Sequence, residues 1–266
     1  MNVTPLHARD SDPVRALADA LSRDGTLKLW SVLVTCLGDI SQDGARDVSG
    51  LALSRLVERI GLQPQAMRVA LHRLKRDGWT LSRRDGRVGY HRLSESALAQ
   101  TRAVADRIYG RANTGAPWLL VGLPPDAPDA LTLLPREMSA VPISRNFALV
   151  SGDLADVPGE WLRADPASGA LPDWVRDIVQ DAACDREFAE LDAALRAIGP
   201  LPDGAEDRFA LRVLVLHGWR RLILRSNPAA EAALGDMRAE ISCRATFLDL
   251  MDALGPPDIS AVEARP

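Results

Sequence analysis

The segment PQAMRVALHRLKR, residues 64–76, carries a narrow apolar stripe opposite a basic side that holds no acid. At about 100° per residue, four apolar residues fall within about ±50° of one direction, as the core-facing side of a helix does. These residues are Met67, Ala70, Leu71 and Leu74. Pro64 falls in the first turn, where a missing N–H costs little, and Gly78 ends the segment. The pattern therefore predicts an amphipathic helix.

Two further helices are expected before it. TLKLWSVLVTCLGD, residues 26–39, is too long for a strand and too short to span a membrane, so we interpret it as a buried helix. LALSRLVERI, residues 51–60, has apolar residues at helical intervals, with Ser49 or Asp47 available as its cap. Gly61 stands where a helix often ends.

A hairpin follows the basic helix. WTLSRRDGRVGYHRL predicts two short strands joined through Asp85-Gly86, because both residues tolerate positive φ. SESALAQTRAVADRIYG, residues 94–110, predicts one more helix. Helix, helix, turn, helix, hairpin and helix is the order of a winged helix-turn-helix domain.

The composition changes after residue 110. PWLLVGL and VPISRNFALVSG predict strands and PDALTLLPREM a short helix, while the chain beyond Asp173 reads as mostly helical. We therefore expect an α+β, mainly helical protein with three parts. They are a winged helix-turn-helix domain at 1–110, a small mixed module at 111–170 and a helical domain at 171–266.

The composition excludes several other classes. With 266 residues, 47% hydrophobic and 26% charged, the chain is neither disordered nor fibrous. No apolar run reaches the roughly 18 residues of a membrane span, and the N-terminus lacks the apolar stretch of a signal peptide. A cytoplasmic protein is the default expectation. The three cysteines show no CxxC spacing, so they predict neither a zinc site nor a disulfide framework.

The charge is unevenly distributed. The formal net charge is −4, yet residues 55–107 hold 12 Lys and Arg against 5 Asp and Glu, a surplus of +7 that leaves −11 elsewhere. A basic block in an acidic protein indicates a nucleic-acid partner.

The outer side of the 64–76 helix suits base recognition. Arg pairs with guanine, Gln with adenine, and an apolar side chain contacts the thymine methyl, while flanking cations contact phosphates. The residues predicted to bind DNA here are Gln65, Arg68, Val69, His72, Arg73, Lys75 and Arg76. The alternative is an ordinary solvated helix face. Three arginines near the hairpin tip, Arg83, Arg84 and Arg87, favour DNA, since an ordinary hairpin would more often interleave acids.

Several motifs resemble those of the PaaX family of repressors of phenylacetate catabolism. The most specific are the GD after the first helix, MRVALHRLKRDGW, and GYHRLSESA leading to RIY. APWLLVGL resembles the start of the family's Cas2-like or ferredoxin-like middle domain, and LVLHGWRRLILRSNP resembles its C-terminal helix with an arginine pair. The resemblance implies a dimeric, cytoplasmic repressor that binds a palindromic double-stranded DNA operator. It also implies release by an aryl-CoA thioester such as phenylacetyl-CoA.

A polar and aromatic cluster in the acidic C-terminal half is a candidate for binding that effector. It consists of His217, Trp219, Arg220, Arg221 and Arg225. Guanidinium groups can hold a CoA phosphate and an indole can stack on a ring. The alternative, which we favour, is that these arginines pair with carboxylates of neighbouring helices.

No catalytic or metal-binding constellation is recognisable, so we expect neither an enzyme nor a cofactor. The phosphate-loop, nucleophile-elbow, zinc-protease and dinucleotide motifs are all missing from the sequence. Asp126, Asp129 and Asp153 of a Cas2-like module lack supporting spacing. The tryptophans Trp30, Trp118 and Trp174 lie in apolar segments and are expected in the core. The competing functional class is a ligand-binding or protein-interaction module whose winged helix no longer reads DNA.

Overall fold

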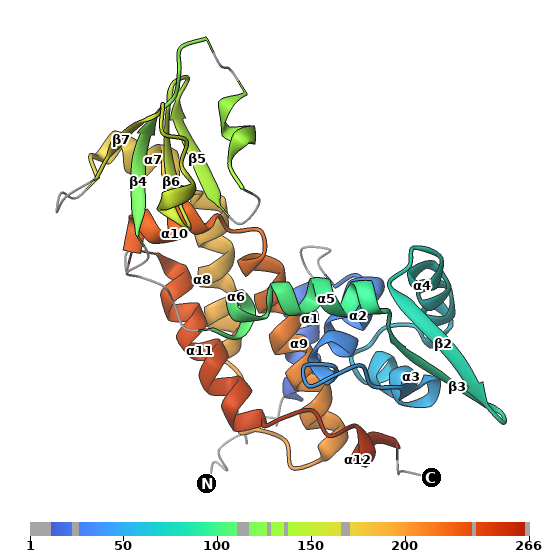
Figure 1. The fold of residues 1–266 in the computed structure, drawn as a ribbon. Coiled ribbons are helices and arrows are strands. Elements are labelled where there is room, and N and C mark those ends of the chain that lie inside the picture. Colours follow the sequence, from blue (N-terminus) through green and yellow to red (C-terminus); the bar gives the residue numbers. More distant parts are fainter. Residues whose placement is uncertain are drawn as a thin grey trace, which may run out of the picture. The chain divides into compact units, whose positions relative to one another are not determined.

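The computed structural model describes residues 12–22, 27–110, 117–126, 129–135, 138–165, 171–235 and 238–263. The contacts divide the chain into two compact units. Unit 1 consists of Met1–Tyr109, Asp192–Arg221 and Thr246–Pro266, and unit 2 of Gly110–Leu191 and Leu222–Ala245. The fold is α+β and mainly helical, as predicted, and the described strands form two small antiparallel sheets (Figure 1). Within these ranges no helix has the length and apolar character to cross a bilayer.

Unit 1 starts with six helices, and the second of them is central to its core. They are α1 (Pro13–Ser22), α2 (Leu29–Ile40), α3 (Gly50–Arg59), α4 (Pro64–Arg76), α5 (Glu95–Ala103) and α6 (Ala105–Tyr109). Every residue of α2 from Val32 to Ile40 is buried, as its largely apolar sequence predicts. The helix expected over 94–110 is interrupted at Val104, between α5 and α6.

Local signals explain the bounds of α3 and α4. The Ser49 hydroxyl accepts a hydrogen bond of 3.1 Å from the Ala52 amide, so Ser49 rather than Asp47 caps α3. Pro64 is the first residue of α4. After α4, Gly78 adopts φ +77°, a conformation that glycine reaches without steric cost.

A three-stranded sheet completes the N-terminal part of unit 1. Its order is β1-β3-β2, with β1 (Val48–Ser49), β2 (Thr80–Asp85) and β3 (Val88–Leu93). Asp85 pairs with Val88, so the two turn residues are Gly86 and Arg87, and the predicted joint at Asp85-Gly86 is shifted by one residue. Gly86 has φ +56°, as a tight hairpin turn requires. The two-residue strand β1 gave no signal in the sequence.

Four C-terminal helices add to unit 1, in full or in part. They are α8 (Ala182–Arg196), α9 (Ala205–Ile223), α11 (Ala239–Leu254) and α12 (Ile259–Glu263). Arg212 of α9 donates hydrogen bonds of 2.7 and 2.9 Å to the two carboxylate oxygens of Asp39, whose side chain is fully buried. At α12, the Glu263 carboxylate accepts a 2.9 Å hydrogen bond from the Ser49 amide. Unit 1 is therefore built from both ends of the chain.

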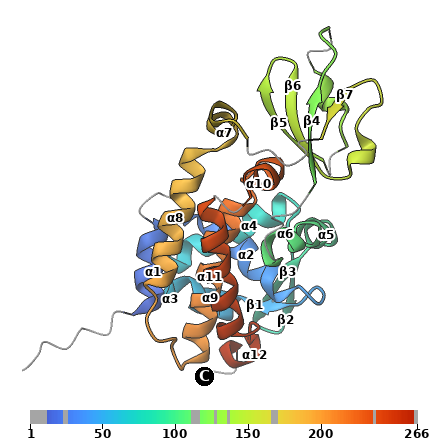
Figure 2. The ribbon, with the colours of Figure 1, turned by 90° about the vertical axis from the view of Figure 1, so that its left-hand side faces the viewer.

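Unit 2 contains a four-stranded antiparallel sheet whose order is β5-β6-β4-β7 (Figure 2). In chain order its elements are β4 (Trp118–Gly122), η1 (Ala130–Leu133), β5 (Ser139–Ser144), β6 (Phe147–Ser151), η2 (Leu154–Asp156) and β7 (Leu162–Ala164). This is the element order of a ferredoxin-like fold in which single 3₁₀ turns, η1 and η2, stand in the place of both helices. β7 was not predicted, because its segment is short and rich in turn residues.

Each face of this sheet packs against a different cluster. Val121, Ala148 and Val150 face the side of η1 and Trp161. Leu149 faces the other side, where it packs with Val175 of α7 (Asp173–Val179) and with α10 (Pro228–Leu234). The alternation along the strands produces both faces.

The helical segment that begins at Asp173 is divided in two. It ends as α7 at Val179 and resumes as α8 (Ala182–Arg196). Gln180 is extended, and the Asp181 carboxylate accepts hydrogen bonds of 3.0 Å from the Ala183 and Cys184 amides. Asp181 thus acts as a cap that starts a new helix.

Two tryptophans correct the sequence interpretation. Trp30 is 43% exposed and Trp174 is 60% exposed, so the prediction that both are core residues is wrong. Trp118 is half-buried. Apolar neighbours in the sequence do not determine which side of a short helix faces the core, and Trp174 lies in the first turn of α7. The predicted division into 1–110, 111–170 and 171–266 stays a prediction, since the contact-based units combine segments from different parts of the chain.

Candidate nucleic-acid interface

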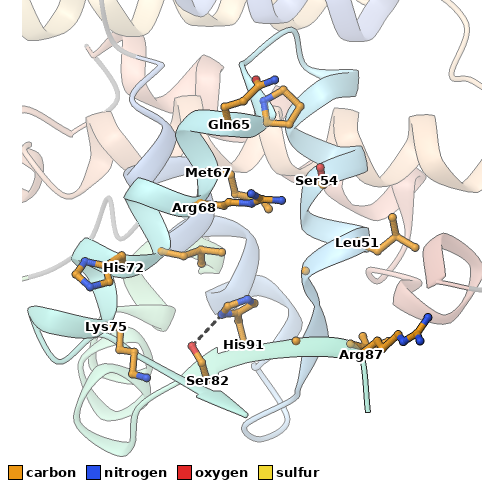
Figure 3. A pocket seen from close by; sticks show the side chains of 15 residues that line it. Leu51, Ser54, Gln65, Met67, Arg68, His72, Lys75, Ser82, Arg87 and His91 are labelled. Carbon is orange, nitrogen blue, oxygen red and sulfur yellow. Dashed lines mark hydrogen bonds between the residues drawn. The ribbon is translucent and has the colours of Figure 1, made fainter. Parts of the chain in front are cut away.

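A groove of about 840 Å³ lies between α3, α4 and the β2–β3 hairpin (Figure 3). Its walls bring together residues from three parts of the chain between Gly50 and His91. The lining residues are Gly50, Leu51, Ser54, Pro64, Gln65, Met67, Arg68, Leu71, His72, Lys75, Ser82, Arg87, Val88, Gly89 and His91. The set includes three cationic side chains and two histidines, and none of the fifteen is a carboxylate. The groove is therefore suited to a negatively charged partner.

The two sides of α4 have the burial that their sequence predicts. Met67, Leu71 and Leu74 are at most 7% exposed, which anchors the helix to the core. All residues predicted for the outer side are exposed, and Val69 is 72% exposed. A rigid helix with a fixed apolar side thus presents the outer side to solvent.

The predicted residues of α4 fall in two groups. Gln65, Arg68, His72 and Lys75 line the groove, as Figure 3 shows. Val69, Arg73 and Arg76 lie outside it. The guanidinium groups of Arg73 and Arg76 lie 3.5 and 3.2 Å from the Asp77 carboxylate at the end of the helix. Their positive charges are therefore partly compensated within the chain.

The hairpin arginines also differ from one another. Arg83 lies 2.6 Å from the Asp47 carboxylate and 3.7 Å from that of Asp85, and its guanidinium lies 4.5 Å from the centre of the Tyr90 ring. The hydrogen bond that Arg83 donates to the Asp47 carboxylate raises the pKa of Arg83. Arg87 lines the groove from the turn. No ion pair joins Arg84 or Arg87 to any residue that the structure describes.

The structure adds residues that the sequence analysis did not select. Leu51 and Ser54 line the groove from α3, and Ser82 and His91 line it from the hairpin. The Nδ1 atom of His91 lies 3.0 Å from the Ser82 hydroxyl (Figure 3). Burial, and then the positive charge of Lys75, lower the pKa of His91. Because Gly89 and His91 are two positions apart on β3, the strand pattern could have placed them on the same face. No pattern in the sequence indicates that α3 approaches the groove.

Two family models match the sequence over these parts of the fold. The model of the PaaX-like protein matches residues 28–97, which include α2, α3, α4 and the hairpin. The model of the PaaX-like, ferredoxin-like domain matches residues 119–162, which cover most of the four-stranded sheet. The chain belongs to the PaaX family. It is a PaaX-type regulator, from a family of transcriptional regulators rather than enzymes. A search of curated proteins found no match.

In this PaaX-like chain, the cluster predicted to bind an effector is placed largely in packed surroundings. Trp219 is fully buried, its indole N–H donates a 2.8 Å hydrogen bond to the Ile108 carbonyl, and its ring stacks on Phe247 with 5.1 Å between centres. His217 is 2% exposed, and its Nδ1 lies 3.2 Å from the Thr35 hydroxyl.

The arginines of that cluster differ in environment. Arg225 is exposed and lies 2.6 Å from the Glu187 carboxylate, the kind of pairing that the alternative interpretation expects. Arg220 and Arg221 are half-buried, and burial lowers the pKa of Arg220. An effector role of these five residues stays a prediction.

Neither metal ligation nor thiol chemistry is suggested by the described residues. In the ranges that the structure covers, no three His, Cys, Asp or Glu side chains are grouped so as to hold a metal ion. Cys36 is buried in α2, and burial raises the pKa of its thiol far above its usual value. Such a thiol is inert.

Proposed function

We propose that this PaaX-type regulator is a cytoplasmic, sequence-specific DNA-binding repressor that reads bases through α4. The observation that carries the proposal is the groove without a carboxylate, where Arg68, His72 and Lys75 of α4 meet Arg87 of the hairpin. B-DNA presents a dense row of phosphates around a major groove that admits a helix. A basic helix fixed to the core by its opposite side fits that geometry.

Within this proposal, the residues divide into readers and anchors. Arg68 and Gln65 carry the groups that pair with guanine and adenine edges, and the exposed Val69 is suited to the thymine methyl. Lys75, Arg84 and Arg87 contact phosphates and fix the register. The hairpin then acts as the wing of a winged helix-turn-helix domain.

The partners follow from family membership and symmetry. We propose that the protein binds a palindromic operator as a homodimer, because two-fold sites require two copies of the reading helix. We further propose that the operon encodes aromatic-acid catabolism of the phenylacetate type and that an aryl-CoA thioester releases the repressor. These parts rest on the PaaX family alone.

Selection of DNA from a random duplex library by the full-length protein is the direct test. We expect a palindromic sequence to be enriched. On that sequence, Arg68→Ala and His72→Ala should each cost roughly 1–3 kcal/mol of discrimination at one position. Arg84→Ala should instead weaken binding to all sequences and lower the salt slope by about one.

Arg145→Ala is the matched control, because Arg145 is an exposed arginine in the β5–β6 turn, outside the groove. It should leave both affinity and specificity unchanged. Failure to enrich any sequence, or equal binding by every variant, would sink the proposal. Sedimentation of the complex should show two chains per operator.

The effector is tested separately on the selected DNA. Phenylacetyl-CoA should release the protein, whereas acetyl-CoA, which carries the same CoA and no ring, should not. Indifference to a panel of acyl-CoA thioesters would remove this ligand while leaving DNA binding intact.

A protein-interaction module remains the second candidate, because large apolar side chains are exposed around the same groove. Leu51 is 55% exposed and Val88 is 42% exposed. A salt titration against random duplex DNA separates the two functions. Affinity that falls steeply with salt supports DNA binding, and absence of any salt-dependent affinity supports the interaction module.

A further inference from the structure

The sheet of unit 2 has a hollow on the face that α7 and α10 cover only in part. The hollow measures about 380 Å³. Its lining residues are Trp118, Leu120, Ile143, Ser144, Phe147, Leu149, Ala164, Asp165, Leu171, Pro172, Trp174 and Val175. All of them lie in unit 2. No part of the proposed DNA-binding function uses this hollow.

The register of the strands explains the apolar floor. Leu120 of β4 lies opposite Leu149 of β6 and opposite Ala164 of β7. These residues point to the same face, with Trp118 two positions before Leu120. Residues at the alternate positions pack into the cluster on the other face. The floor is therefore fixed by three paired strands and is preformed, as ligand sites usually are.

The walls are aromatic and lie at the surface. Trp174 is 60% exposed and Phe147 is 42% exposed, although both are large apolar side chains. Trp118 contributes a third ring. Aromatic side chains placed around a cavity favour a flat apolar ligand, which can stack against one ring and meet the edge of another.

The volume of the hollow and the charge of its lining restrict the class of ligand further. A cavity of about 150 Å³ holds one benzene molecule, so this hollow has room for a ring with a substituent or for two fused rings. Asp165 is the single ionisable side chain among the lining residues, and Ser144 is the single hydroxyl. A carboxylate at the site disfavours an anion and favours a cation or a neutral hydrogen-bond donor.

We propose that this hollow is a binding site for a small neutral or cationic aromatic molecule, with its ring on the Trp118, Phe147 and Trp174 side chains and its polar group toward Asp165. The site does not depend on DNA binding. Because Asp165 carries a negative charge, free aromatic carboxylates are not preferred ligands of this site.

Benzyl alcohol, benzylamine and benzoate are matched probes, since they share one ring and differ in charge. With the full-length protein, calorimetry should detect saturable binding of the first two. Benzoate should bind about fivefold more weakly, the factor that corresponds to about 1 kcal/mol for two charges 4 Å apart in water. Asp165→Asn should reduce that difference.

A substitution that fills the hollow tests whether the probes bind there. Ala164→Phe places a ring at an exposed position of β7 and should reduce the affinity for benzyl alcohol at least about tenfold, or about 1.4 kcal/mol. Leu133→Phe, at the exposed η1 turn outside the hollow, should leave it unchanged. In NMR spectra, the indole N–H signals of Trp118 and Trp174 should shift with benzyl alcohol, whereas that of Trp219 should not.

Three results would overturn the proposal. The first is absence of saturable binding by all three probes, and the second is binding that Ala164→Phe leaves intact. The third is a concentration-dependent dimer that Ala164→Phe dissociates without any probe binding, since the hollow would then be an interface between copies. Each result can be obtained whether or not the protein binds an operator, because no DNA is present.

Discussion

Arg212 in α9 and Asp39 in α2 form a double hydrogen bond across 173 positions of the sequence, with distances of 2.7 and 2.9 Å. The Tyr109 hydroxyl donates a third bond of 3.0 Å to the same carboxylate. The Asp39 side chain is fully buried and that of Arg212 is 11% exposed. These three groups join the N-terminal helices of unit 1 to a C-terminal helix.

Removing one member of this ion pair should be strongly destabilising. We expect Arg212→Ala to lower the free energy of unfolding by about 3–5 kcal/mol, because it leaves a buried carboxylate without its cation. Urea unfolding followed by circular dichroism measures the change. Arg76→Ala, which removes an exposed ion pair, should change it by less than about 1 kcal/mol. Similar losses for both variants would show that the buried ion pair contributes no more to the free energy of unfolding than the exposed one.

Arg83 and Arg84 should contribute differently to DNA binding although they are adjacent. Arg83 is already paired with Asp47 and stacked on Tyr90, so its charge releases fewer counterions on binding. We expect Arg83→Ala to leave the slope of log affinity against log salt nearly unchanged, and Arg84→Ala to lower it by about one. Fluorescence anisotropy on the selected operator at several salt concentrations measures both. Equal slopes for the two variants would contradict this assignment.

His91 should make the stability of unit 1 depend on pH. Its pKa in the folded protein lies below the ordinary value because of burial and Lys75. The unfolded chain therefore binds its proton first as the pH falls. The stability associated with neutral His91 is present above a pH of about 6.5 and is lost as the pH falls toward the lowered folded value.

The comparison of wild type with His91→Gln at pH 7.5 and pH 5.5 measures this effect. The wild type should lose more stability than the variant between the two conditions, while His72→Gln, at an exposed position, should behave as the wild type. Lys75→Met should raise the pKa of His91 in an NMR titration. An unchanged titration would exclude Lys75 as a cause of the shift.

Gly86 should be required for its backbone conformation rather than for space. Its φ is +56°, and a Cβ placed there meets no other atom within 4 Å. Gly86→Ala should therefore cost about 1–2 kcal/mol of stability from backbone strain alone. Gly86→Asn should cost less, since asparagine tolerates this region. Gly199→Ala, where space is also open and φ is not positive, is the control and should not destabilise.

Local patterns predicted much of unit 1. The apolar stripe of α4, the cap of α3 at Ser49 or Asp47 and the glycine at position 78 each act over a few residues, so they can be recognised in the sequence. β1 could not be predicted, because its two residues pair with His91 and Tyr90 about forty positions later. The same limit applies to the approach of Leu51 and Ser54 to the groove.

The C-terminal half shows where local patterns are ambiguous. His217, Trp219 and Arg225 looked like one cluster, yet His217 contacts Thr35, Trp219 stacks on Phe247 and Arg225 pairs with Glu187. A long apolar helix with scattered polar residues does not reveal which neighbours those residues meet. The exposure of Trp174 could not be predicted for the same reason. This exposed ring forms part of the wall of the hollow on the sheet.

The distance in sequence between Asp39 and Arg212 also determines when the protein can finish folding. During synthesis, α2 to α4 and the hairpin leave the ribosome long before α9 is made. Until α9 is made, the Asp39 carboxylate cannot pair with Arg212. The core around α2 is therefore completed only after α9 has been made. A product that terminates before α9 would lack Arg212, so its Asp39 carboxylate would stay unpaired and α4 would not be held on a complete core.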